Sequence, residues 1–339
     1  MADTARKPIR IVWAVDPLGE EPGYQVAGAE FLAKLGERAS VEVFPIYLYG
    51  SYPLEYPLYE PPALDPAVRA EAMAAMAAIR ERHAIAGLKD LEILVAGYTS
   101  LKEGVVKLVE HAEALEVDAV FATTHARKGV SRWIIGSFAE ALMERSTVPL
   151  LILNPESKVE WRPDAALFAT DFSTESRSAF RKFLPFARAL RAKVSIYHQK
   201  SHPLSEGVAP AFGGVAMTMT DRDHDARSSE SFAQEWRGVA ESEGVEAEMI
   251  VDPKLALSPA DGALAKAEDL GAWIAIAAQG KPVPVAIFGS NARHILRDSR
   301  VPVWLYRAPR NAFCDPIELS EKDIARDLRL EGSGEEEGR

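Results

Sequence analysis

The pattern of apolar and polar positions divides the chain into short apolar runs separated by segments of helical character. Apolar runs bounded by polar residues are typical of buried strands, and apolar residues recurring every three to four positions are typical of amphipathic helices. In the first half we expect strands at residues 9–15, 41–48, 91–96, 117–122 and 148–153, and helices at residues 24–35, 66–86, 104–115 and from Gly136 onward. Strands alternating with helices in this way predict a doubly wound α/β domain with a five-stranded parallel sheet.

The second half repeats this order. Strands are expected at residues 165–170, 193–198, 247–251, 273–277 and 301–306, and helices at residues 175–190, 227–243, 259–270 and 289–297. Residues 201–226, rich in Pro, Gly, Ser and Asp, predict a long loop. Asp16 and Asp171 lie 155 residues apart, and the pair Gly136-Ser137 recurs as Gly289-Ser290 after 153 residues. Matching landmarks at matching separation indicate a duplication.

Two domains and a tail follow from this repeat. We predict a first domain at residues 1–157, a second at residues 158–310 and an acidic tail at residues 311–339, with the polar segment 156–163 as linker. The tail ends EGSGEEEGR, a composition that cannot bury enough surface to fold, and a short helix is expected before it, near residues 320–328.

Composition and charge restrict the kind of protein. The 339 residues are 47% hydrophobic and 26% charged, which is typical of globular chains. The formal net charge of -11 argues against a nucleic-acid partner, because phosphate binding needs a basic surface. The start, MADTARKP, has no apolar core, and no run of about eighteen apolar residues occurs, so we expect a cytoplasmic protein without a membrane partner. The single cysteine, Cys314, excludes an internal disulfide.

Candidate chemistry lies where the predicted strands end. Asp16 and Asp171 follow the first strand of each half, where a carboxylate can accept hydrogen bonds from a nucleobase amine or a ribose hydroxyl, or can simply cap the next helix. Gly136-Ser137 and Gly289-Ser290 open a helix, where exposed N–H groups favour an anion, although serine is also an ordinary N-cap. Arg127 would add positive charge near such an anion. Both interpretations stay open for each pair.

Several stronger motifs do not occur. The sequence contains no Gly-x-x-x-x-Gly-Lys-Ser/Thr, no Gly-x-Gly-x-x-Gly after the first strand and no Gly-x-Ser-x-Gly. Its seven histidines give no metal spacing on a predicted helix, so no metal is predicted.

The arrangement resembles the universal stress protein family, whose ATP-binding members carry Gly-x-x-Gly, nine residues and then Gly-Ser/Thr. The first half keeps the spacing from Thr123 to Gly136-Ser137, but Thr123 and Ala126 replace the two glycines. The second half has Gly289-Ser290-Asn291-Ala292-Arg293 before its last strand, and a one-residue deletion aligns Ala277 and Gly280 with the glycines. Thr170-Asp171-Phe172-Ser173 is similar to the family's turn after strand one.

The resemblance implies the adenine nucleotide α-hydrolase-like fold, in two tandem copies, and an adenine nucleotide such as ATP as ligand. It implies a set of ligand-binding residues: Asp16, Thr123, Arg127, Gly136, Ser137, Thr170, Asp171, Gly280, Gly289, Ser290 and Asn291. In this family the fifth strand pairs with its counterpart in another domain, so strands 148–153 and 301–306 are expected to pair within the chain as a pseudo-dimer, with a homodimer of chains in addition.

Three functions remain at this point. The leading hypothesis is a non-catalytic small-molecule-binding and signalling protein of the stress response. The second is an ATP-hydrolysing or phosphoryl-transferring enzyme that uses Asp16 or Asp171. The third is an interaction scaffold that binds no ligand.

Overall fold

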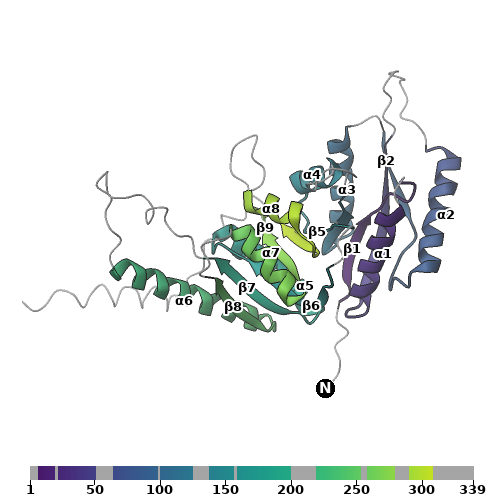
Figure 1. Ribbon diagram of the computed structural model, residues 1–339. Helices are drawn as coiled ribbons and strands as arrows, with labels where there is room; N and C mark the ends of the chain where they lie inside the picture. The colour runs from purple at the N-terminus through teal and green to yellow at the C-terminus, as the bar shows by residue number, and fades with distance from the viewer. Residues whose placement is uncertain are drawn as a thin grey trace, which may run out of the picture. The chain divides into compact units, whose positions relative to one another are not determined.

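Helices and strands alternate through both halves of the computed structural model (Figure 1). The structure describes residues 7–19, 22–50, 64–97, 100–124, 137–155, 159–199, 219–252, 258–278 and 290–307. The elements of the first half are β1 (Ile9–Ala14), α1 (Pro22–Gly36), β2 (Val41–Gly50), α2 (Pro66–Arg82), β3 (Glu92–Gly97), α3 (Leu101–Ala114), β4 (Ala119–Thr123), α4 (Ser137–Arg145) and β5 (Leu150–Leu153). Those of the second half are β6 (Arg162–Ala169), α5 (Thr174–Ala189), β7 (Lys193–Gln199), α6 (Met219–Ser242), β8 (Ala247–Asp252), α7 (Pro259–Leu270), β9 (Ala272–Ala277), α8 (Ser290–Asp298) and β10 (Val303–Tyr306).

All described strands belong to one ten-stranded sheet in the order β3-β2-β1-β4-β5-β10-β9-β6-β7-β8. Within each half the strands are parallel and have the same relative order, which confirms the predicted doubly wound arrangement. The halves meet at β5 and β10, which pair antiparallel with Leu151 opposite Trp304. The predicted pairing of the two fifth strands is therefore confirmed, and residues 1–308 form one compact unit. The domain boundary at residue 157 stays a prediction.

Helix starts are fixed by side-chain caps that the sequence makes visible. Asp65 accepts a hydrogen bond from Ala67 N before Pro66, and Ser258 accepts one from Asp261 N before Pro259, as expected for an N-cap followed by proline. Ser100 and Glu103 form a reciprocal capping box at the start of α3. These caps satisfy backbone donors that a helix cannot satisfy internally.

The core has one layer on each face of the sheet, and both layers run through the two halves. One layer contains Phe31 of α1, Met76 of α2, Phe183 of α5 and Trp236 of α6. The other contains Leu108 of α3, Leu142 of α4, Leu264 of α7 and Ile295 of α8. Among the described elements, four helices thus cover each face, as a parallel sheet that is buried on both sides requires.

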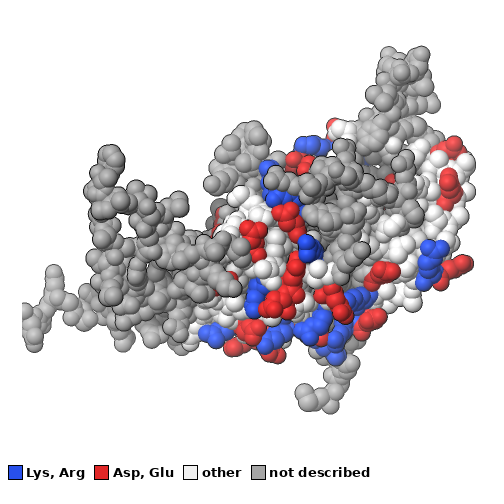
Figure 2. Space-filling model, viewed as in Figure 1, with Lys and Arg blue, Asp and Glu red and all other residues white. Residues whose placement is uncertain are grey.

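Additional contacts fasten the first half to the segment that begins the second. Lys34 of α1 donates to the carbonyl oxygen of Trp161 and lies 4.7 Å from the centre of its ring. Arg38 forms an ion pair of 2.6 Å with Asp164. On the face seen in Figure 2, basic and acidic side chains are interspersed among the described residues, as such pairs require. No helix in the described part of the chain is both long and apolar enough to cross a membrane.

Among the boundaries that differ from those predicted, three change the description of a segment. Residues 219–226, predicted as loop, form the first turns of α6, because proline and glycine are absent between Met219 and Gly238 and nothing in the sequence interrupts a helix there. The predicted linker overlaps β6, which begins at Arg162; Pro163 is tolerated because the pairing with β9 shifts register between Arg162 and Ala166. Helix α2 ends at Arg82, four residues early. The tail and its predicted helix lie outside the described residues.

Trp304 tests the importance of the junction between the halves. It is fully buried in β10, opposite Leu151, and its ring centre lies 5.2 Å from that of Phe183. We expect Trp304→Ala to lower the free energy of unfolding by about 3–5 kcal/mol, measured by urea denaturation. Arg38→Ala, which removes a largely exposed ion pair, is the control and should cost less than about 1 kcal/mol. Equal losses in the two variants would contradict the central place of the junction.

Candidate functional site

The strand order reverses between β1 and β4 in the first half and between β6 and β9 in the second. Ligands of open α/β sheets bind beyond the carboxyl ends of the strands at such points. Asp16 follows β1 and Thr123 ends β4; Thr170 and Asp171 follow β6. The two candidate sets therefore gather at the two reversal points. Arg127, Gly136, Gly280 and Gly289 lie outside the described residues.

The turn after β6 is organised by its own side chains. Thr170 Oγ1 accepts a hydrogen bond from Phe172 N at 2.9 Å. Asp171 Oδ1 accepts one from Ser173 N at 3.0 Å and one from Ser176 Oγ at 2.7 Å, while Ser173 caps α5. The N-cap of α5 is thus Ser173, and Asp171 supports the turn that leads into this helix. These bonds also fix the direction of an exposed carboxylate at the reversal point.

Phe172 has a left-handed backbone conformation, with φ of 60°. The other described non-glycine residues with positive φ, Glu116 and Arg191, directly follow the C-caps of α3 and α5, where this conformation is common. Phe172 instead lies in a turn between strand and helix, and a bulky residue held there costs about 1–3 kcal/mol. The equivalent position of the first half is Pro17, whose ring fixes φ near about −65° and forbids this turn.

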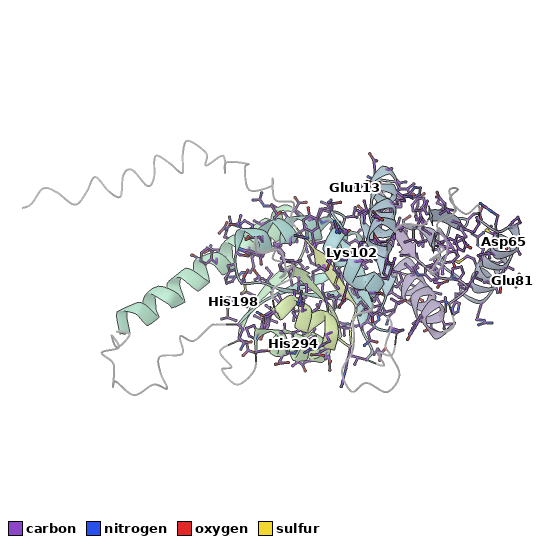
Figure 3. The ribbon with its side chains drawn as sticks, turned by 90° about the horizontal axis from the view of Figure 1, so that it is seen from above. Asp65, Glu81, Lys102, Glu113, His198 and His294 are labelled. Carbon is purple, nitrogen blue, oxygen red and sulfur yellow. The ribbon has the colours of Figure 1, made fainter. Side chains whose placement is uncertain are left out.

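His198, labelled in Figure 3, lies in the second half and contacts this turn. Its Nδ1 is 2.9 Å from the carbonyl oxygen of Thr170, and because a carbonyl can only accept, Nδ1 carries the proton. The rings of His198 and Phe172 are 4.4 Å apart, and Phe172 also stacks on Phe232 at 5.4 Å. The packing holds the imidazole against Thr170 and Phe172.

The first half has a different set at the matching place. Asp16 Oδ1 accepts a hydrogen bond from Leu18 N at 3.1 Å, and the Asp16 carbonyl accepts one from Gln25 Nε2 at 2.6 Å. The bonds Val15 N to Ile46 O and Thr170 N to Tyr197 O correspond, so Tyr47 takes the place of His198. Burial above all, and then the Asp16 carboxylate, raise the pKa of Tyr47 to about 12.

A polar contact that the sequence did not reveal lies at the ends of β7 and β8. Tyr197, buried where the first half has Ile46, donates its hydroxyl to Asp252 Oδ2 at 3.1 Å. Gly262 makes room for it, since a Cβ there would lie 2.3 Å from the hydroxyl oxygen. Burial, and then the bond to Asp252, raise the pKa of Tyr197. In the sequence, the position of Gly262 is marked by the pattern Ser-x-x-Asp-Gly at 258–262, which repeats Ser-x-x-Glu-Gly at 100–104.

The helices that begin beyond β4 and β9 start with exposed residues: Ser137 on α4, and Ser290 and Asn291 on α8. Each helix has nine residues, long enough for an N-terminal partial positive charge. The structure does not bring Ser137 or Ser290 into a hydrogen bond with either aspartate among the described contacts. Within the described ranges, no group of three or more His, Cys, Asp and Glu side chains could hold a metal ion.

Tyr47 provides a pH test of the surroundings of Asp16. An unfolded tyrosine ionises near about pH 10, so above that value the unfolded chain releases this proton first and stability falls as the pH rises towards 12. We expect Tyr47→Phe to make the loss of stability in this window shallower, and Asp16→Asn to lower the Tyr47 pKa, as followed by tyrosinate absorbance. If stability and tyrosinate absorbance depend on pH in the same way in the wild type and in both variants, Tyr47 is not buried beside Asp16 as described.

Comparisons with known proteins agree with this fold. The model of the universal stress protein family matches residues 10–154 and 164–307. Universal stress protein E of Escherichia coli (strain K12) is 26% identical over 151 residues, 42% of this chain and 46% of that protein, so the chain spans about half the length of the curated relatives it matches.

Solved structures with a similar fold include a universal stress protein from Archaeoglobus fulgidus DSM 4304. It has a TM-score of 0.57 at 18% identity, covering 88% of this chain and 98% of that chain. A putative universal stress protein from Pseudomonas aeruginosa UCBPP-PA14 has a TM-score of 0.56 at 14% identity, covering 90% and 95%. With two consecutive matches to the family model and five-stranded repeats in the order found here, the chain belongs to the universal stress protein family.

Proposed function

We propose that this chain is a non-catalytic small-molecule-binding protein with a signalling role in the stress response, and that its second half holds the ligand at the carboxyl ends of β6 and β9. The observation that carries the proposal is the left-handed conformation of Phe172. A strained turn persists only where the surrounding structure maintains it, and such turns concentrate at binding sites. Here the strain orients Asp171 and packs His198 at the point where the strand order reverses.

The difference between the halves supports the choice of the second. Pro17 excludes the same turn in the first half. Thr123 and Ala126 also place side chains where the ATP-binding pattern of the family has bare backbone. The pair Gly-Ser is common to both halves, but the second half has the smaller residues at the two preceding positions, Ala277 in place of Thr123 and Gly280 in place of Ala126.

The ligand class that fits is an adenine nucleotide or a related molecule. Asp171 and His198 offer a carboxylate and an imidazole to hydroxyl and amine groups, and the start of α8 offers backbone N–H groups to an anion. A homodimer in addition to the intrachain pairing, a cytoplasmic location and the lack of a nucleic-acid partner stay predictions from the sequence.

The hydrogen bonds of the two aspartates favour a protein that binds its ligand without converting it. Asp16 Oδ1 and Asp171 Oδ1 both accept backbone or hydroxyl hydrogen bonds from the turns in which they lie. A carboxylate that holds a turn in place is less suited to take a proton from attacking water, and phosphoryl transfer also needs residues that position metal and water. The scaffold alternative differs from this proposal in predicting that no nucleotide binds.

The test is equilibrium dialysis of the full chain against ATP, ADP and AMP, together with an assay for nucleotide hydrolysis. We expect saturable binding without turnover, weakened about tenfold or more in Asp171→Asn, because a hydrogen bond to a charged group is lost. Asp16→Asn is the matched control from the first half and should bind within about twofold of wild type.

Other results of the dialysis and hydrolysis assays would support a different function or a different site. Hydrolysis that disappears in Asp171→Asn would establish the enzyme, and no retention of any nucleotide would support the scaffold. Binding weakened by Asp16→Asn alone would place the ligand in the first half. Thermal unfolding of both variants separates loss of a contact from loss of the fold.

A further inference from the structure

The side chain of Phe232 on α6 differs from the other aromatic side chains of this chain in its contact with water. It is 37% exposed, and no other aromatic residue in the described part of the chain is exposed to this extent. A single exposed apolar residue is ordinary on a protein surface. Phe232, however, stacks on Phe172, the residue with the left-handed backbone in the turn after β6. Its exposed ring therefore belongs to the candidate site of the second half.

Three aromatic rings come together at the carboxyl ends of β6 and β7. The ring of Phe172 lies 4.4 Å from that of His198, at an angle of 33°, and 5.4 Å from that of Phe232, at 18°. Offset stacking of aromatic rings has separations of about this size. We call these three residues the aromatic platform. Phe232 is its exposed member, so a further ring can reach the platform there.

Trp236 supports the platform from the core. It lies one helical turn after Phe232 on α6 and is buried. Its ring meets that of Phe172 edge-on, at 5.6 Å and 73°, and lies 4.8 Å from that of Phe180 on α5. The platform is thus held in place by the folded chain, and a ligand that binds to it loses little affinity to the ordering of side chains.

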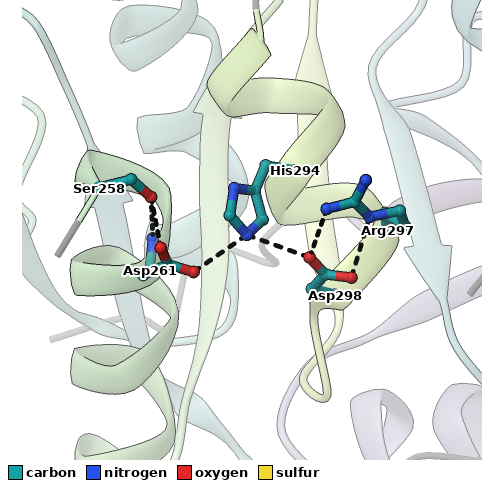
Figure 4. A network of polar contacts seen from close by, with 5 residues as sticks. All are labelled: Ser258, Asp261, His294, Arg297 and Asp298. Atoms are coloured by element: carbon teal, nitrogen blue, oxygen red, sulfur yellow. Dashed lines mark hydrogen bonds and ion pairs between the residues drawn. The ribbon is translucent and has the colours of Figure 1, made fainter. Parts of the chain in front are cut away.

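The platform and the start of α8 lie on two sides of the point where the strand order reverses. The strands β9, β6 and β7 are neighbours in this order, so the ends of β9 and β7 are two strand spacings, about 10 Å, apart. Polar contacts fasten α8 to α7 (Figure 4): His294 Nε2 lies 3.0 Å from Asp261 Oδ1 and 3.0 Å from Asp298 Oδ2. A ligand with an anionic group at the start of α8 would therefore extend its other end towards the platform.

The first half has no counterpart of the platform. Pro17 takes the place of Phe172, and α2, with the sequence PAVRAEAMAAMAAIRER, contains no aromatic residue. The shared fold therefore does not need an aromatic residue on this helix. A role in ligand binding explains why the second half alone has one that is exposed and stacked at the reversal point.

We propose that the aromatic platform binds a planar heteroaromatic ring, and that Phe232 is a specificity-determining residue of the second half. Every nucleobase has a flat π-face that stacks on an aromatic side chain, and this contribution to affinity does not depend on phosphate groups. In the neutral His198 ring, Nδ1 donates to the carbonyl oxygen of Thr170, and Nε2 is then an acceptor with no partner among the described contacts. It suits an amine on the bound ring.

The ligand class is therefore a molecule that carries a base, a nucleoside as well as a nucleotide. The inference rests on the proposed function for the location of the ligand and adds to it the part of the ligand that is selected. Phe232 lies outside the glycine pattern of the ATP-binding members of the family, which extends from the end of β9 to the start of α8 in this half.

Equilibrium dialysis of the full chain against AMP, adenosine and ribose 5-phosphate separates the ring from the phosphate. We expect adenosine to bind at most about tenfold more weakly than AMP, because the base supplies much of the affinity. Ribose 5-phosphate, which has no base, should not displace AMP. Phe232→Ala should weaken AMP binding about tenfold, as loss of one base–aromatic stack does, whereas Phe232→Tyr keeps the ring and should stay within about threefold of the wild type.

Met73→Ala is the matched control, because it removes a similarly exposed apolar side chain, 41% exposed, from α2 of the first half. This variant should bind AMP as the wild type does. Thermal unfolding of all three variants checks that the fold is kept.

The inference and the proposed function fail in different ways. Equal AMP binding by the wild type and Phe232→Ala would overturn the role of the platform and leave the proposed function in place. Retention of ATP without adenosine, displacement of AMP by ribose 5-phosphate, or equal losses in Phe232→Ala and Phe232→Tyr would do the same. If the wild type retains no nucleotide or nucleoside at all, both are wrong.

Discussion

The antiparallel pairing of β5 with β10 is the interaction on which the rest of this molecule depends. It turns two edges that would otherwise expose unpaired backbone groups into the middle of one sheet. The two core layers then extend through both halves, with Trp304 buried at the junction. Lys34 and Arg38 add contacts to Trp161 and Asp164 at the start of the second half. Each half is thereby stabilised by the other, and neither needs to keep every feature of an independent domain.

This mutual support explains how the halves can differ while sharing one fold. Where the second half holds Phe172 in a strained turn, the first has Pro17, and where the second buries Tyr197 against Asp252, the first has Ile46. The helix pairs α3–α4 and α7–α8 are joined by a lysine and a histidine respectively. We propose on this basis a division of roles, in which the first half is mainly a structural partner and the second half binds the ligand.

The sequence was sufficient to predict the order of strands and helices, the duplication and the joining of the fifth strands, because apolar runs and repeated landmarks record burial directly. It could not show the conformation of Phe172, since aromatic residues seldom adopt positive φ. The contacts around this residue, the rings of His198, Phe232 and Trp236 and the hydrogen bond to Thr170, come together only in the folded chain. The polar contact of Tyr197 could not be predicted from the strand in which it lies, because its partner Asp252 is 55 positions away. The contact between His294 and Asp261 could not be predicted for the same reason, because the two residues lie on different helices.

The division of roles is tested most directly by hydrogen exchange of the full chain with and without saturating ATP. The account predicts that ATP slows exchange in the turn after β6, residues 170–176, and at the end of β7, while residues 15–19 after β1 exchange as before. Protection at residues 15–19 with none at residues 170–176 would contradict it.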